Sequence, residues 1–145
     1  MLELLEAVVL RGAAPEAAGW FRRNLDIGQP SGSTALRAAF AGAGRRLAGT
    51  DPALSADDLA RLRDAGVVAP ERWPLTTFAR AALLLRALRN LAPEEHVGLV
   101  RELFRRGDFR EQAAVLQSLI LLPDPARFVA LAVEACRTNV RDVFE

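Results

Sequence analysis

Helix start and stop signals recur along this chain, whereas strand signals are scarce. Ser55 with Asp58, and Asp108 with Glu111, have the spacing of capping boxes, in which two side chains satisfy backbone amides at a helix start. Pro93 suits a first helical position, because its missing N–H would have no partner there. No alternation of apolar and polar residues is long enough to indicate an extended sheet. The sequence therefore predicts an all-α fold of about seven to eight helices.

The same signals set approximate helix boundaries. The expected helices span residues 1–11, 15–25, 33–47, 55–65, 77–90, 93–106, 108–122 and 124 onwards. Thr77 is the expected cap of the helix over 77–90, and Trp73-Pro74 is expected to anchor the preceding linker to the core. Short connections in the second half favour antiparallel packing of neighbouring helices.

Residues 81–105 recur weakly as residues 113–137, with a period of 32 residues. Pro93 matches Pro125 at two expected helix starts, and most other matches are Ala or Leu. Helix-pair repeats of this length build α-solenoids, in which stacked pairs share a continuous core. Two arrangements are compatible with the pattern, namely a short HEAT- or TPR-like solenoid and an irregular helical bundle.

The composition bounds the possible functions. With 145 residues, of which 51% are apolar, the chain is long enough for one compact domain over residues 1–145. A net charge of +1 and 6% aromatic residues give no basic, aromatic-rich surface, so we expect no nucleic-acid partner. All 19 basic residues are arginine, which indicates a GC-rich genome or, as the alternative, anion recognition by guanidinium groups.

The sequence also carries signals about location. Cys136 is the only cysteine, so no disulfide can form within the chain, as is usual in a reducing compartment. The N-terminal residues lack a basic segment before an apolar run, and no apolar stretch is long enough to span a bilayer. We therefore expect a cytoplasmic protein without a transmembrane segment.

Candidate chemistry is sparse. His96 is the only histidine and has the sequence context of a packing or surface residue. Cys136 follows an apolar helical stretch, which favours a buried and unreactive thiol. Gly42 and Gly44 lack the spacing of a phosphate-binding loop, and helix weakening or close helix packing explains them better. The pattern predicts no catalytic residues, no metal site and no cofactor.

One polar cluster near the C-terminus invites two interpretations. Glu134, Arg137 and Thr138 share a helix face at spacings of three and four, and Asn139 follows them. Thr and Asn are poor choices for a helix interior, which favours buried hydrogen bonds or a binding surface. The alternative is a ladder of ion pairs in which Arg137 pairs with Glu134.

Residues 134–145 also carry a family resemblance. Arg137-Thr138-Asn139, followed by Val143-Phe144-Glu145, is similar to the EboA family, as is the segment from Trp73 to Leu85 with Arg80. The resemblance implies that Trp73 and Arg80 join Glu134, Arg137, Thr138 and Asn139 as candidate ligand- or partner-binding residues. EboA proteins usually continue beyond the position of Glu145, so we expect a shortened or truncated chain.

The resemblance implies a pathway and no established reaction. EboA proteins are encoded in a bacterial gene cluster associated with moving a secondary-metabolite precursor. The first hypothesis is a non-enzymatic helical scaffold that binds a protein partner or the small-molecule precursor of that pathway. The alternative is an enzyme or enzyme subunit with a ligand site around Arg137, Thr138 and Asn139.

Overall fold

The computed structural model describes residues 1–26 and 32–138, and this part of the chain is all-helical. Eight α-helices and three short 3-10 helices make up its regular structure, with no strand among the described residues, which confirms the predicted fold class and helix number. The α-helices are α1 (Leu2–Gly12), α2 (Pro15–Asp26), α3 (Gly32–Leu47), α4 (Ala56–Asp64), α5 (Leu75–Arg89), α6 (Pro93–Arg106), α7 (Phe109–Ser118) and α8 (Val129–Thr138). The 3-10 helices are η1 (Pro70–Arg72), η2 (Leu119–Leu121) and η3 (Pro125–Phe128).

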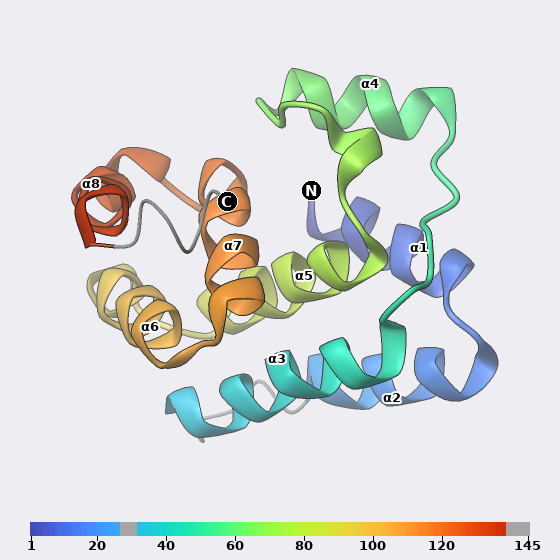
Figure 1. Ribbon diagram of the computed structural model, residues 1–145, viewed down its shortest axis with the longest axis horizontal. Coiled ribbons are helices and arrows are strands. Elements are labelled where there is room, and N and C mark those ends of the chain that lie inside the picture. The colour runs from blue at the N-terminus through green and yellow to red at the C-terminus, as the bar shows by residue number, and fades with distance from the viewer. Residues whose placement is uncertain (27–31, 139–145) are drawn as a thin grey trace.

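Helix α5 lies at the centre of the molecule (Figure 1). It contacts α1, α2, α3 and α7, so helices from both halves of the chain cover it. Eleven of its fifteen residues are buried, which is typical of a helix that is covered all round instead of along one stripe. The choice between a solenoid and an irregular bundle stays a prediction.

The predicted capping boxes are confirmed. In α4 the Ser55 hydroxyl accepts a hydrogen bond from the Asp58 amide at 3.0 Å, and the Asp58 carboxylate accepts one from the Ser55 amide at 3.0 Å. In α7 the Glu111 amide donates to Asp108 at 2.8 Å, and the Asp108 amide donates to Glu111 at 3.1 Å. These reciprocal bonds satisfy amides that a helix start leaves without partners, which explains why the two helices begin where they do.

The predicted start of α5 at Thr77 is wrong. The helix begins at Leu75, with Pro74 in extended conformation as its N-cap residue. Thr77 is buried inside the first turn of the helix, next to the fully buried Phe78. The first turn of α5 therefore forms without a side-chain cap, and Thr77 is its third helical residue. Trp73 is buried, as the anchoring role expected of it requires.

Candidate functional site

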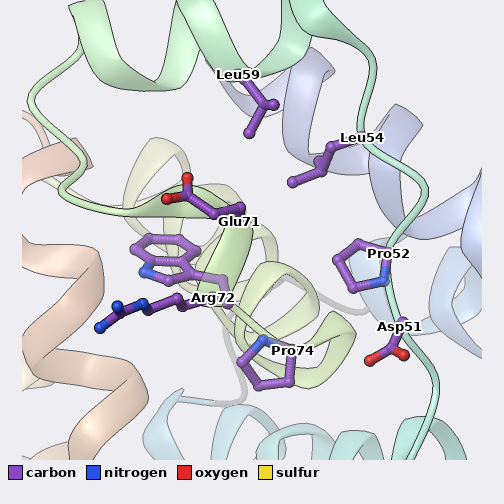
Figure 2. Close-up of a pocket in the computed structure, with 8 residues that line it drawn as sticks. Asp51, Pro52, Leu54, Leu59, Glu71, Arg72 and Pro74 are labelled. Atoms are coloured by element: carbon purple, nitrogen blue, oxygen red, sulfur yellow. The ribbon is translucent and has the colours of Figure 1, made fainter.

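A pocket of about 320 Å³ opens between α4 and the linker that leads into α5 (Figure 2). Its lining comes from the loop before α4, from α4 itself and from η1 with the two residues after it. The lining residues are Asp51, Pro52, Leu54, Leu59, Glu71, Arg72, Trp73 and Pro74. The pocket forms between α4 and η1 because only a short turn joins these two elements and they contact one another.

Trp73 forms a rigid part of the pocket wall. Its side chain is 5% exposed, and its ring packs against the Phe78 ring with centroids 5.2 Å apart and planes tilted by 55°. Its backbone amide donates to the Pro70 carbonyl at 3.1 Å, which closes η1. Tilted aromatic packing of this kind contributes about 1 kcal/mol beyond simple burial. A tryptophan held on both its ring and its backbone gives the pocket a preformed apolar surface.

The charged groups of the pocket lie at its rim. Glu71 accepts a hydrogen bond from the Arg63 guanidinium at 3.0 Å, and both side chains are about half exposed. A backbone hydrogen bond to the Glu71 carboxylate, helped by the nearby Arg63, holds its pKa below the ordinary value of 4.5. Solvent screens an exposed pair of this kind, so it contributes little to stability. The rim therefore keeps a carboxylate in its charged form.

Arg80 lies elsewhere, on the side of α5 that packs against α3. The residue is 5% exposed, and its Nε–H donates to the Phe40 carbonyl at 3.1 Å. Burial lowers the pKa of the guanidinium, and the negative charges of Glu111 and Asp108 partly oppose this effect. Arg80 is not among the residues that line the Trp73 pocket.

The C-terminal cluster lies at a third place. Glu134 on α8 accepts a hydrogen bond from Arg105 of α6 at 2.8 Å, and Arg101 lies 3.9 Å from its other oxygen. The hydrogen bond from Arg105 lowers the pKa of Glu134. Arg137 is exposed, and Thr138 is the last described residue of α8. Asn139 lies outside the described residues, so the predicted ligand role of the motif stays a prediction.

The six candidate residues therefore do not form one site. Trp73 lines the pocket, Arg80 packs against α3, and Glu134 links α8 to α6. Sequence reasoning missed the other seven lining residues. One signal that could have found some of them is the Trp73-Pro74 anchor, because both of these residues line the pocket.

His96 and Cys136 differ in their burial. His96 is buried, as a packing histidine is expected to be, and its Nε2 lies 2.8 Å from the Leu88 carbonyl and 3.2 Å from that of Leu91. Leu88 lies in the last turn of α5 and Leu91 follows the helix, so His96 links the start of α6 to the end of α5. The prediction of a buried Cys136 is wrong, because its side chain is exposed. Leu131 and Ala135 form the buried face of α8, and Cys136 is not part of that face.

The described residues lack two kinds of feature. Residues 1–26 and 32–138 contain no group of three His, Cys, Asp or Glu side chains that could hold a metal ion. In the same ranges, no helix combines the length and the apolar character that crossing a bilayer requires.

Comparison with known families gives a match over the whole chain. The family described as metabolite traffic protein EboA matches residues 1–145, the whole chain. The chain belongs to the EboA family. This match confirms the resemblance inferred from the Arg137-Thr138-Asn139 motif and links the chain to metabolites. No curated protein and no solved structure gives a significant match.

Proposed function

We propose that this EboA-family chain is a non-enzymatic binding protein that holds a small metabolite in the pocket beside Trp73. Its role would be to support the biosynthesis or export of a secondary-metabolite precursor in the cytoplasm of a bacterium, together with protein partners of the same pathway. The family description, metabolite traffic protein, supports a metabolite as the cargo.

The observation that carries the proposal is the pocket itself. Its volume of about 320 Å³ lies in the range of small-molecule sites, which run from about 300 to 1,000 Å³. Leu54, Leu59 and Trp73 supply apolar surface. The charged lining residues are two acids and one base, namely Asp51, Glu71 and Arg72. In Figure 2, Leu54 and Leu59 face the linker that carries Glu71 and Arg72 across the pocket. This lining suits a molecule with an apolar body and a few polar groups.

The alternative is an enzyme or enzyme subunit with its site near Arg137. Within the described residues, no specific observation favours that site over the Trp73 pocket, since Arg137 is exposed and the nearby Glu134 already pairs with α6. The experiment that tests the binding proposal also tests this alternative.

The test is native mass spectrometry of the purified chain after incubation with a small-molecule extract of the source cells. The blocking variant is Leu59→Trp, because a larger side chain at this position fills the pocket. The matched control is Ala60→Trp, which adds the same side chain to the exposed face of α4. Wild type and Ala60→Trp are expected to retain a bound compound of unchanged mass, and Leu59→Trp is expected to lose it.

Two results would contradict the proposal. Equal retention by Leu59→Trp and Ala60→Trp would place the ligand outside the Trp73 pocket. Conversion of the compound to a new mass by the pure chain would show an enzyme, and the site around Arg137 would then be the first to test.

A further inference from the structure

The lining of the Trp73 pocket carries more negative than positive side chains. Its ionisable residues are Asp51, Glu71 and Arg72, and the other five lining residues have uncharged side chains. A pocket lined with an excess of one sign favours ligands of the opposite charge. Which of the three charges is left for a ligand depends on the partners that each one has within the protein.

The charge of Glu71 is already compensated. The Arg63 guanidinium donates a hydrogen bond to its carboxylate at 3.0 Å, and the positive charges of Arg63 and Arg72 both help to lower its pKa. Arg63 lies at the end of α4, so this ion pair connects α4 to η1 across the turn between them. Glu71 therefore needs no cation from a ligand.

The Asp51 carboxylate has no such partner. Within residues 1–26 and 32–138, no side chain or backbone amide forms an ion pair or hydrogen bond with it, and its side chain is exposed. Asp58, seven residues later, differs because it accepts hydrogen bonds from both Arg11 and the Ser55 amide. Asp51 is thus the lining acid whose carboxylate is available to a ligand.

The one base of the lining does not neutralise Asp51. In Figure 2 the Arg72 side chain extends away from Asp51 and Pro52, which lie on the other side of the pocket. No ion pair joins Arg72 to Asp51 within the described residues. The side of the pocket that carries Asp51 therefore keeps its negative charge.

The Asp51 side of the pocket is held in place by the backbone. The Leu75 amide donates to the Thr50 carbonyl in a long hydrogen bond of 3.4 Å, which ties the residue before Asp51 to the first residue of α5. Pro52 also limits the backbone conformations that Asp51 can adopt. Because Trp73 is fixed as well, the carboxylate and the apolar wall need little ordering when a ligand binds.

We propose that the Trp73 pocket takes a small organic cation, a protonated amine with an apolar body. Its ammonium group pairs with the Asp51 carboxylate, and its body lies against Trp73 and Leu59. Ammonium N–H groups form charge-assisted hydrogen bonds with a carboxylate, whereas an anionic ligand would be repelled by it. This inference rests on the binding function proposed above and names the chemical class of its ligand.

The test compares three probes that share a phenylethyl group and differ in charge, namely phenethylamine, phenethyl alcohol and hydrocinnamate. Each is titrated into the full chain, and the N–H signals of Trp73 are followed by NMR, with Trp20→Phe identifying the indole signal of Trp73. Asp51→Asn removes the charge and keeps the size of the side chain. The matched control is Asp64→Asn, because Asp64 is an exposed acid of α4 that does not line the pocket.

We expect phenethylamine to shift the Trp73 signals saturably and to bind more tightly than the alcohol, with hydrocinnamate the weakest of the three. Affinity for phenethylamine should fall about fivefold or more in Asp51→Asn, as the loss of an ion pair worth about 1 kcal/mol implies, and should stay unchanged in Asp64→Asn. Affinity for the uncharged alcohol should be the same in wild type and in Asp51→Asn.

Three results would overturn the assignment of a cation. They are equal affinity of wild type and Asp51→Asn for phenethylamine, tighter binding of hydrocinnamate than of phenethylamine, and Trp73 signals that respond to none of the probes. The binding function would survive each of them if Leu59→Trp still loses the compound that wild type retains from the extract. The failure of one proposal is therefore distinguishable from the failure of the other.

Discussion

Asp58 and Arg80 are buried charged residues whose surroundings differ. The Asp58 carboxylate lies 2.5 Å from the Arg11 guanidinium and also accepts the Ser55 amide, so it joins α1 to the start of α4. Burial raises the pKa of Asp58, but the hydrogen bonds from Ser55 and Arg11 outweigh it and leave the pKa below the ordinary 3.8. Asp58 thus favours folding in its charged form, whereas burial disfavours the charged form of Arg80 and lowers its pKa.

Stability should therefore depend on pH through Asp58. Because its pKa is lower in the folded chain, its contribution is complete above about pH 4 and is lost as the pH falls through the folded pKa. We expect Asp58→Asn to lower the free energy of unfolding by about 2 kcal/mol at pH 7. Urea unfolding at pH 7 and at pH 3 measures the difference, which should shrink at the lower pH. An equal loss at both values would contradict this role.

Ala69 holds the linker in a strained conformation. Its φ of 51° and ψ of 56° are left-handed, a region that costs a residue with a side chain about 1 kcal/mol. Ala69→Gly is expected to raise the free energy of unfolding by roughly that amount. The same change at Ala60, inside α4, should lower it by about 1 kcal/mol. Thermal unfolding of the two variants checks this, and shifts of the same sign would argue against strain at Ala69.

At the scale of the helices, glycine is needed where a side chain of a neighbouring helix comes close to the backbone. Gly42 of α3 faces the Trp20 ring of α2, and an added Cβ would lie 2.5 Å from that ring. A Cβ atom added to Gly44 of α3 would lie 2.7 Å from a terminal nitrogen of Arg80. Gly98 of α6 has nothing within 4 Å of the same position. The close packing predicted for Gly42 and Gly44 is therefore confirmed, although the sequence did not indicate that their neighbours are a tryptophan and a buried arginine.

Replacing Gly42 and Gly98 by alanine should change the free energy of unfolding in opposite directions. Gly42→Ala is expected to lower the free energy of unfolding by about 1–3 kcal/mol, because the bulky Trp20 ring has to move. Gly98→Ala is expected to raise it by up to about 1 kcal/mol, through helix propensity alone. Chemical unfolding of both variants gives the comparison. Stabilisation by both substitutions would show that α2 and α3 do not pack as closely as described.

At the scale of the whole molecule, local signals predicted the helices but not their assembly. Capping pairs such as Asp108 with Glu111 act within four residues, so the sequence reveals them directly. The burial of Arg80 and the exposure of Cys136 depend on which helices cover α5 and α8, and the sequence pattern contains no such information. For the same reason the pocket could not be predicted, since its walls come from segments that fold together around Trp73.

The most direct test of the account uses Trp73 as its own reporter. Trp20→Phe leaves Trp73 as the only tryptophan of the chain, and its fluorescence can be titrated with the extract fraction that the chain retains. We predict a saturable change in Trp73 emission that disappears when Leu59→Phe is added to fill the pocket. Retention of the compound without any change in Trp73 emission would contradict a metabolite site beside Trp73.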